Sequence, residues 1–581
     1  MTTKVDRSEE LEHSVLRVGF SRRGFLRTVA AAAVVPAMAS LLSACGGESA
    51  DSQQPATTPS GGTGGAASPS EATTPAGAAT STTETAGEPK RGGTLHWYLP
   101  DDPPDLDPHM QTTSSLQWVL GMCYNGLLRY DVGPGKGPES VEASTPIPDL
   151  AERYEVVDPT TYVFTLRQGV KFHDGTELTA EDVAFSLDRI RTNSPEFQRA
   201  YAFTPVDTIE ATDPTTVTVK MKEPYAAFIN QVAAAYTRIA PKHVIEAQGD
   251  MKQTIVGTGP FKLESYQRGQ RLVVVRNEDY WEEGIPYLDR IDMAIMPDNS
   301  TQLAAFIAKQ LDIYEALNYS QVETIQNTVP DVVVMESAIF GLNGIGCNTS
   351  VKPLDDVRVR QALFYAIDQQ QIIDIVMNGH GVKQRAVPAG YAGWVVPYDE
   401  LPLGDGPNIE KAKQLLAEAG YPDGFSITCK TVYRYTQREA TVAAEQLKAI
   451  GVNVELIDVE YGAFLQARNS GDFELIAFAL APFGDIEDFT TALYHTQGSR
   501  NFGGWGNVEL DELLDQGRRE LDEEKRKEIF RRVQEILAEN CWVIDLPRET
   551  FLEVWHPYVK DYVSAQNPER GLAFWRTWLD K

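Results

Sequence analysis

Residues that commonly carry catalytic chemistry occur in this chain, but not in catalytic patterns. The sequence has no G-x-S-x-G nucleophile elbow, no G-x-x-x-x-G-K-S/T phosphate loop and no H-E-x-x-H metal pair. Its eight histidines stand at positions 13, 96, 109, 173, 243, 380, 495 and 556, without the spacing of metal ligands. His173 adjoins an Asp-Gly turn, where a structural role is favoured over catalysis. We therefore expect a protein that is not an enzyme and that holds no metal and no cofactor.

The stretch from Gly257 to Pro260, Gly-Thr-Gly-Pro, only partly matches a dinucleotide-binding loop. Proline follows the second glycine and no helical pattern begins there, although the phosphates in such a loop bind at a helix N-terminus. We interpret this stretch as the entry to a strand.

Four of the five cysteines are widely separated. They form no C-x-x-C pair, so they indicate neither a zinc site nor a redox motif, and isolated buried thiols are expected. These four are Cys123, Cys347, Cys429 and Cys541.

The fifth cysteine, Cys45, ends a segment with the order of a secretory signal. Arg22 and Arg23, followed two residues later by Phe-Leu, precede an apolar run at 29–44 that contains Pro36. The paired arginines resemble a twin-arginine export signal, and the final Leu-Ser-Ala-Cys resembles a bacterial lipobox. The run is shorter than the roughly 20 apolar residues of a permanent membrane span. We expect residues 1–45 to be a signal and Cys45 to be lipidated.

Residues 46–90 are expected to form a disordered tether. From Gly46 to Glu88 there is no Val, Leu, Ile, Met or aromatic residue, so nothing in this stretch can bury apolar surface. A flexible coil of that length reaches about 35 Å. Such a tether would keep a folded domain close to a membrane partner and raise its effective concentration there.

The remaining chain is acidic and has ample material for a large core. The net charge of the whole chain is −30 and its hydrophobic fraction is 42%, so global disorder is excluded. A surface this negative repels phosphate backbones and anionic headgroups, so we expect no nucleic-acid partner.

Strand and helix patterns alternate through this region and predict a mixed α/β fold with more than one lobe. Period-two patterns predict strands at 162–166 and 217–221, and a strand at 271–276 should pair with 261–264. A capping box at 179–182 predicts that a helix follows.

A second group of patterns predicts a parallel sheet. Strands at 425–432 and 452–456 enclose a helix that should run from 436 to about 450, which makes a βαβ unit. The stretch 473–480 is almost entirely apolar, as expected for a strand that is buried on both faces.

From Gly92 to the end, the chain resembles the extracytoplasmic solute-binding proteins of ABC importers, in the large peptide- and nickel-binding family, family 5. The resemblance rests on a series of stretches in a fixed order. They are DPPDLDPH (102–109), YNGLLRYD (124–131), PDLAE (148–152), FTLRQGVKFHDG (164–175), GTGPF (257–261), NEDYW (277–281), DDVRVRQAL (355–363) and AEAGYP (417–422).

The resemblance implies a two-lobed α/β fold of the periplasmic-binding-protein type, with an additional inserted subdomain, that closes over its ligand about a hinge. It assigns 91–133, 256–345 and 546–581 to lobe I, 134–255 to the inserted subdomain and 346–545 to lobe II. The chain would cross the hinge at 346–348 and at 544–547.

The resemblance also implies positions for ligand contacts. Peptide-binding members often hold the peptide's amino group with an aspartate that follows a Gly-Trp pair. Ala479-Leu480 stands in place of that pair, so an ungapped match puts Phe483 at the amine-binding position and Asp485 two residues later. Asp485 could reach an amine if the loop shifts; otherwise it is a solvated loop acid.

Further ligand-binding candidates follow from matching segments. Arg434 could pair with a carboxylate, and its neighbouring tyrosines could line an apolar or sugar-binding wall, because ligands lie beyond the carboxyl ends of parallel strands. For each aromatic residue, a place in the core is at least as good an interpretation. The candidates are Asn125, Phe340, Asn343, Tyr433, Arg434, Tyr435 and Trp505.

The function that the resemblance implies is that of the substrate-binding component of an ABC importer. It would capture a small solute, most often an oligopeptide, and deliver it to the permease and ATPase complex. An oligosaccharide or another polar solute is the alternative cargo; an exported hydrolase or a sensory receptor is the alternative of another class. We expect a monomer outside the cytoplasmic membrane, held by its lipid anchor, in the periplasmic space if an outer membrane is present.

Overall fold

A computed structural model describes most of the chain after residue 87. The described residues are 88–110, 113–137, 145–192, 197, 200–316, 318–337, 341–391, 393–432, 436–480, 485–564 and 569–581. All of them belong to one compact unit, Thr82–Lys581. The expected signal with Arg22 and Arg23, the expected lipidation site Cys45 and nearly all of the tether lie outside them. Within the described residues, no helix has the length and apolar character needed to cross a membrane.

The inserted subdomain contains a four-stranded antiparallel sheet in the order β4-β5-β7-β6. Its strands are β4 (Ala151–Asp158), β5 (Thr161–Leu166), β6 (Val206–Asp213) and β7 (Thr216–Met221). The predicted strands at 162–166 and 217–221 are therefore confirmed, and alternate residues along both are buried.

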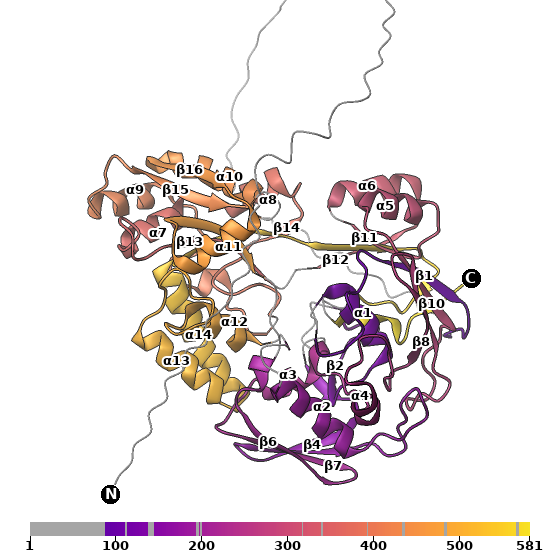
Figure 1. Ribbon diagram of the computed structural model, residues 1–581. Coiled ribbons are helices and arrows are strands. Elements are labelled where there is room, and N and C mark those ends of the chain that lie inside the picture. The colour runs from indigo at the N-terminus through magenta and orange to yellow at the C-terminus, as the bar shows by residue number, and fades with distance from the viewer. Residues whose placement is uncertain are drawn as a thin grey trace, which may run out of the picture. The chain divides into compact units, whose positions relative to one another are not determined.

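Helix α2 (Ala180–Thr192) packs on this sheet, as Figure 1 shows, and begins where the capping box predicted. Oδ2 of Asp182 accepts hydrogen bonds of 3.0 Å from the backbone N and from Oγ1 of Thr179. Val183, Leu187 and Ile190 lie on its buried face. Smaller elements complete the subdomain: β2 (Leu128–Tyr130), β3 (Pro146–Pro148), α3 (Phe228–Ala233) and α4 (Lys242–Gln248).

Lobe I contains a four-stranded sheet in the order β1-β10-β9-β8. Its strands are β1 (Thr94–Leu99), β8 (Phe261–Gln267), β9 (Arg271–Arg276) and β10 (Arg290–Ile295). The predicted pairing of 261–264 with 271–276 is confirmed, with Phe261 opposite Arg276. Helix α1 (Ser114–Cys123) has nine buried residues, and six of them belong to the hydrophobic core that packs on this sheet.

The Gly-Thr-Gly-Pro stretch does lead into a strand, because β8 begins at Phe261. Its glycines are required by a close approach to helix α1. A Cβ atom on Gly257 would lie 2.0 Å from the carbonyl oxygen of Cys123, and one on Gly259 would lie 2.4 Å from its carbonyl carbon. The glycines therefore serve backbone packing.

A second sheet of lobe I has the order β11-β20-β12. Its strands are β11 (Ile313–Ala316), β12 (Val333–Ser337) and β20 (Phe551–Trp555), and its helices are α5 (Asn299–Ile307) and α6 (Tyr319–Thr328). The C-terminal hairpin pairs β21 (Val559–Lys560) with β22 (Trp578–Leu579).

Lobe II is built on a five-stranded sheet in the order β16-β15-β17-β13-β18. Its strands are β13 (Leu342–Cys347), β15 (Phe425–Thr431), β16 (Val452–Asp458), β17 (Leu475–Leu480) and β18 (Val543–Leu546). β15 and β16 are parallel and are connected through α10 (Gln437–Leu447), which confirms the predicted βαβ unit. Five of the six residues of β17 are buried, as its apolar run predicted.

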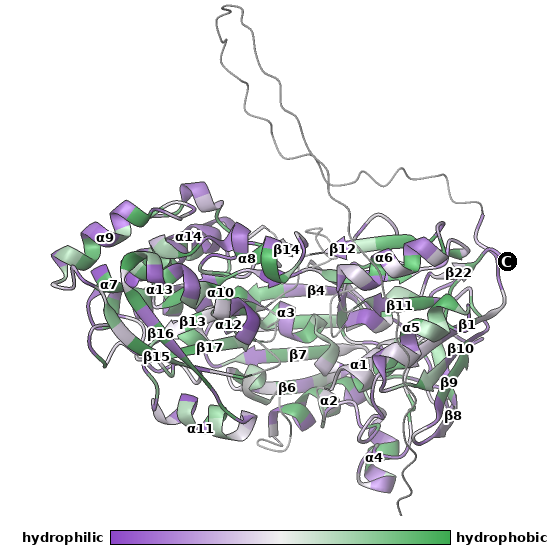
Figure 2. Ribbon diagram, turned by 90° about the horizontal axis from the view of Figure 1, so that it is seen from above, coloured by the Kyte–Doolittle hydropathy of each residue, from purple (hydrophilic) through white to green (hydrophobic). Residues whose placement is uncertain are grey.

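The other helices of lobe II alternate apolar and polar residues, because one side of each packs on the core. Figure 2 shows this alternation of colours along α9. These helices are α7 (Val357–Ala366), α8 (Gln369–Val376), α9 (Ile409–Glu418), α11 (Tyr461–Ser470), α12 (Ile486–Tyr494), α13 (Val508–Arg519) and α14 (Glu523–Asn540). A short ladder joins β14 (Gly381–Val382) to β19 (Arg548–Glu549).

Strand pairing near the predicted lobe boundary links residues on both sides of it. Residues 342–345, predicted to belong to lobe I, lie in β13 and pair with β17 and β18 of lobe II. Their neighbours in the chain, β12 before β13 and β20 after β18, belong to the three-stranded sheet of lobe I. β12 ends at Ser337 and β13 begins at Leu342, while β18 ends at Leu546 and β20 begins at Phe551. The predicted hinge crossings at 346–348 and 544–547 stay a prediction.

Residues before the predicted start of the inserted subdomain at 134 also pack with it. β2 pairs with β3, and Leu127 and Leu128 pack in the hydrophobic core of the subdomain. The division is set by backbone pairing and core membership, which sequence similarity does not report directly.

The four cysteines among the described residues are free and buried, as expected. Burial raises the pKa of each thiol, to about 12 for Cys347, Cys429 and Cys541. They are therefore poor nucleophiles.

Candidate functional site

The carboxyl ends of several parallel strands meet at one edge of the five-stranded sheet. β16, β15 and β17 run in one direction, and β13 is antiparallel to β17 and β18. The start of β13 is therefore at the edge where β17 and β18 end, with Leu342 opposite Leu480 and Asn343 opposite Leu546. Ligands of open α/β sheets bind beyond the carboxyl ends of strands. This edge, which also adjoins both connections to lobe I, is the candidate site.

Most of the predicted contacts that adjoin this edge in sequence lie outside the described residues. Tyr433, Arg434 and Tyr435 come after β15, Phe483 comes after β17, and Phe340 comes before β13. Their roles stay predictions. Asn343, the second residue of β13, is described and is 6% exposed.

Asn343 contacts an arginine that the sequence analysis did not identify. Nη1 of Arg548 donates to Oδ1 of Asn343 over 3.3 Å and to the carbonyl oxygen of Leu480 over 3.4 Å. Gly341 makes room for it, because a Cβ atom there would lie 2.7 Å from Nη1 of Arg548. The backbone of Gly341 has a φ of +126°, which favours glycine. A cation that directly follows the Leu-Pro end of a buried strand is the signal that could have identified Arg548.

Gln384 holds the same edge in place. Its Oε1 accepts from the backbone N of Asn343 over 3.0 Å, and its Nε2 donates to the carbonyl oxygen of Gly341 over 2.7 Å. Gln384 is completely buried. The strand end beside Arg548 is therefore fixed by side-chain hydrogen bonds on both sides of residue 342.

Charges of both signs surround Arg548. Burial lowers the pKa of Arg548. Burial raises the pKa of Glu439 and of Glu549, although the positive charges of Arg438 and Arg548 lower the pKa of both glutamates. Among the described residues, no carboxylate lies within ion-pair distance of Arg548. A partly buried guanidinium without a close counter-ion favours an anionic group in its vicinity.

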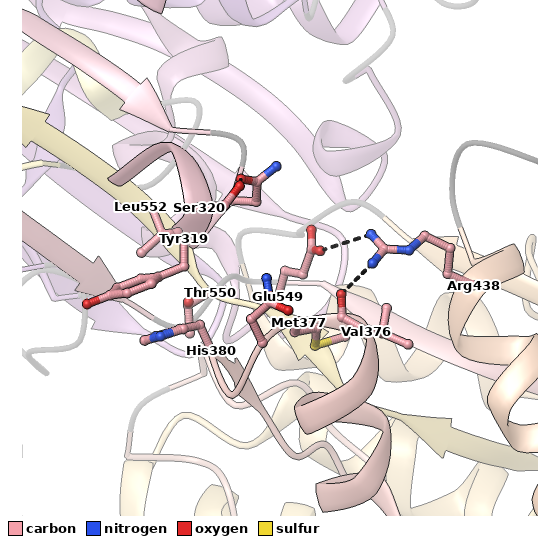
Figure 3. Close-up of a pocket in the computed structure, with 11 residues that line it drawn as sticks. Tyr319, Ser320, Val376, Met377, His380, Arg438, Glu549, Thr550 and Leu552 are labelled. Atoms are coloured by element: carbon pink, nitrogen blue, oxygen red, sulfur yellow. Dashed lines mark hydrogen bonds and ion pairs between the residues drawn. The ribbon is translucent and has the colours of Figure 1, made fainter. Parts of the chain in front are cut away.

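A cavity of about 240 Å³ opens beside these residues, between α6 of lobe I and α8 of lobe II. Figure 3 shows Glu549 in this cavity, facing Arg438, whose Nη1 is 4.0 Å from Oε1 of the glutamate. On its other side, the His380 ring stacks on Tyr319 with the ring centroids 3.4 Å apart. The cavity therefore has side chains from both lobes.

The carboxylate of Asp485 is bound by other residues of the protein, whereas an amine-binding acid in a loop would be free to contact a ligand. It caps helix α12, and Oδ1 accepts from the backbone N of Glu487 over 2.8 Å. Arg526 donates to both of its oxygens, and Asn230 of the inserted subdomain donates to Oδ2 over 2.6 Å. The pKa of Asp485 is lowered, because Arg526 and these hydrogen bonds outweigh burial. Its carboxylate is thus occupied by partners within the protein, and an amine contact stays a prediction.

Asn125 and Trp505 lie in the interior. Asn125 donates to Asp149 over 2.9 Å and accepts from Oγ1 of Thr258 over 3.0 Å. Trp505 is 1% exposed, and its Nε1 donates to the carbonyl oxygen of Cys347 over 2.7 Å. Ligand binding by either side chain stays a prediction.

His173 has a structural place beside the glycine stretch. Its Nδ1 accepts from the backbone N of Gly257 over 3.2 Å, and its Nε2 donates to the carbonyl oxygen of Gly259 over 3.1 Å. Burial lowers its pKa to about 4, so the ring is neutral near pH 7. Across the described part of the chain, no group of His, Cys, Asp and Glu side chains is arranged to hold a metal ion.

Comparison with known proteins identifies one family. The family model described as bacterial extracellular solute-binding proteins, family 5 Middle, matches residues 145–501. The chain is 27% identical over 509 residues to the dipeptide-binding protein of Escherichia coli strain K12, covering 81% of this chain and 92% of that protein. It is 28% identical over 453 residues to the glutathione-binding protein GsiB of Salmonella typhimurium, covering 75% of this chain and 86% of that protein.

Among solved structures, HbpA2 from Haemophilus parasuis aligns with a TM-score of 0.75 and 27% identity over 84% of this chain and 100% of that chain. These matches confirm the expected fold class, a mixed α/β two-lobed fold of the periplasmic-binding-protein type. They also confirm the resemblance on which that expectation was based.

Proposed function

Because the chain belongs to the bacterial extracellular solute-binding proteins of family 5, we propose that it captures a peptide between its lobes and delivers it to an ABC importer. Members of this family bind substrates rather than convert them, so the peptide would leave intact. The two curated relatives are named for a dipeptide and for glutathione, and both ligands carry free carboxylates.

The observation that carries this proposal is the strand edge beside the hinge connections. Arg548, which follows β18 in the connection to lobe I, contacts Asn343 at the start of β13 in lobe II. A carboxylate bound to Arg548 would act as the counter-ion of this partly buried guanidinium and would lie where the two lobes meet. We therefore place the ligand's carboxylate near Arg548, with Arg434 as a second cation that follows β15 in sequence.

Capture would work through a shift in population between open and closed forms. A ligand that contacts both lobes binds the closed form better, and only this difference in affinity drives closure. Moving the protein from 1% to 99% closed requires about 5.5 kcal/mol of differential affinity. The importer's permease would then recognise the closed form, and no covalent step is needed.

The position of the protein in the cell follows from its N-terminus. Export through the signal with Arg22 and Arg23, and acylation of Cys45, would hold the folded part outside the cytoplasmic membrane on its tether. We propose that a single copy serves each capture event, since all contacts on which the proposal depends lie within one chain.

A binding screen tests the peptide proposal. The full chain with Cys45→Ser is titrated by calorimetry with dipeptides, tripeptides and glutathione, and with an oligosaccharide as the competing class. A peptide at 100 times its Kd should raise the free energy of unfolding by about 2.7 kcal/mol. Binding of the oligosaccharide alone, or hydrolysis of a bound peptide seen by mass spectrometry, would contradict the proposal.

The carboxylate position is tested with matched variants and ligands. Arg548→Met should weaken binding of a free peptide and should leave binding of its C-terminal amide nearly unchanged. Arg438→Met is the control, because Arg438 is exposed at the same cavity and is 4.0 Å from Glu549. If Arg548→Met weakened the binding of the free peptide and of its C-terminal amide equally, Arg548 would not bind the ligand's carboxylate.

A further inference from the structure

The inserted subdomain and lobe II touch through a set of polar side chains that are buried, except for Asn230, which is half-buried. Asn230 donates to Asp485, the hydroxyl of Tyr225 donates to Oδ1 of Asp488 over 3.4 Å, and Gln231 donates to Oδ2 of Asp488. The backbone N of Ala226 also donates to the carbonyl oxygen of Arg518 over 2.8 Å. These residues come from the subdomain segment 223–231 on one side and from α12 and α13 on the other.

The two sides of this contact belong to separate hydrophobic cores. Tyr225 and Phe228 pack in the core of the subdomain, whereas Ile486 and Phe489 pack in a core of lobe II. A cavity of about 470 Å³ lies beside the contact and is lined from both sides, including by Asn230 and Arg526. The polar contacts therefore join side chains whose apolar neighbours belong to two different cores, so these contacts can separate without breaking either core.

Three buried acids lie close together on the lobe II side. They are Asp485, Glu487 and Asp488 at the start of α12, and Arg526 and Arg518 lie near them. Arg526 pairs closely with Asp485, whereas Nη1 of Arg518 is 4.0 Å from Oε1 of Glu487. Tyr225 is the titratable group that faces them from the subdomain.

We infer that this contact, with Asn230 as the positioning residue, is a clasp that holds the inserted subdomain against lobe II and sets the closed population. The clasp consists of Tyr225, Asn230 and Gln231 with Asp485, Glu487 and Asp488. Its role in peptide capture rests on the proposed function, but its existence does not, since it forms between residues of the protein alone.

Closing the clasp should take up a proton. Burial and the neighbouring Asp488 raise the pKa of Glu487 to about 8, although Arg518 opposes this. When the clasp opens, Glu487 gains water and its pKa falls toward the usual value near 4.3. The closed form binds the proton more tightly, so the closed population grows as the pH falls from about 8 toward 5 and shrinks as the pH rises through 8.

Distance measurements on the protein without peptide test the clasp directly. Spin labels are placed at Val157→Cys in the subdomain and Val508→Cys in lobe II, whose side chains are 63% and 74% exposed. The four native described thiols are buried and would stay unlabelled, and Cys45→Ser removes the remaining one. Pulsed electron resonance then gives the distribution of distances between the two bodies.

In the parent protein, the fraction of short distances between the two spin labels should grow as the pH falls. The ratio of the closed to the open population should rise by up to about tenfold per pH unit. Asn230→Asp puts a carboxylate against Asp485 and should shift the distribution to long distances at every pH. Glu487→Gln should remove the pH response. Glu223→Gln is the matched control, because Glu223 forms an exposed ion pair with Arg519 at the same contact, 3.0 Å apart, and should behave as the parent does.

The clasp would be overturned if Asn230→Asp left the distances unchanged, or if the pH response persisted in Glu487→Gln. Peptide affinity measured on the same proteins keeps this result separate from the proposed function. A failed clasp with normal peptide binding would reject only the clasp, whereas a working clasp without any peptide binding would reject only the proposed cargo.

Discussion

Arg526 and Asp485 form a buried ion pair in which Nη2 of the arginine donates to Oδ1 of the aspartate over 2.6 Å. Their side chains are 6% and 2% exposed. Arg526 also donates from Nε to the carbonyl oxygen of Gly517 over 2.9 Å, so the pair joins α14 to the C-terminal end of α13 and the start of α12.

Removing the cation from this pair should destabilise lobe II strongly. Arg526→Met leaves Asp485 buried without its counter-ion, which costs about 3–5 kcal/mol of unfolding free energy. Denaturation in guanidinium chloride measures the loss. Arg519→Met, which breaks only the exposed pair with Glu223, should cost at most about 1 kcal/mol. Similar losses for both variants would show that Asp485 is not held by Arg526.

His109 should make the protein less stable in mild acid. Nη1 of Arg189 donates to its Nδ1 over 2.9 Å, and its Nε2 donates to the carbonyl oxygen of Arg238 over 2.8 Å, so the buried ring is neutral. Burial, and then Arg189, lower its pKa to about 4. The unfolded chain takes up this proton first, so stability that is present above pH 6.5 is lost as the pH falls toward 4.

The measurement compares the parent with His109→Gln between pH 7 and pH 4. The pH-dependent part of the difference in unfolding free energy should be at most about 3 kcal/mol. Glu487 and Asp545 have raised pKa values, so they stabilise the folded protein as the pH falls, opposite to His109. Both proteins contain these groups, so their contributions cancel in the difference. A difference that is constant across this range would contradict the neutral, buried state of His109.

Gly257 should not tolerate a side chain. An alanine Cβ there would lie 2.0 Å from the carbonyl oxygen of Cys123, which is backbone and cannot move aside without shifting α1. We expect Gly257→Ala to cost about 1–3 kcal/mol or more. Gly137→Ala, where no atom lies within 4 Å and φ is not positive, should be nearly neutral in the same thermal melt. Equal melting temperatures would contradict the close approach.

Cys45 should decide whether the protein stays at the membrane. Cys45→Ser should release the exported protein into the soluble extracytoplasmic fraction, because a lipobox cysteine carries several acyl chains and one chain alone anchors only marginally. Detergent phase partitioning of cell fractions measures this. Replacement of Arg22 and Arg23 by lysine should instead retain the protein inside the cell. A Cys45→Ser protein that still partitions with the membrane would contradict lipidation.

The secondary structure could be predicted where hydrophobic periodicity is strong. Strands β5, β7 and β9 and the βαβ unit around α10 followed directly from alternating or helical patterns, because side-chain burial sets those periods. The boundaries between the lobes stay predictions, because local patterns do not fix them. Residues 342–345 could be assigned only from the partners of β13, and strand partners distant in sequence leave no local pattern.

The ligand contacts named from the sequence stay predictions, but the structure shows the surroundings of some of these residues. Asn343 was chosen from a matching segment, and the structure places it at the strand edge beside the hinge. Arg548 and Gln384, which contact it there, were missed because they are separated from it by 205 and 41 positions in the chain. Asp485 was chosen for its charge, but its partners Arg526 and Asn230 come from other elements, and only the fold reveals that they occupy its carboxylate.

The most direct test of the account is small-angle scattering of the full chain with Cys45→Ser, with and without a saturating peptide identified by calorimetry. Closure of the two lobes around the peptide predicts a smaller radius of gyration in the bound state, and mass spectrometry should recover the peptide uncut. An unchanged radius of gyration at saturation, or recovery of cleaved peptide, would contradict capture by closure.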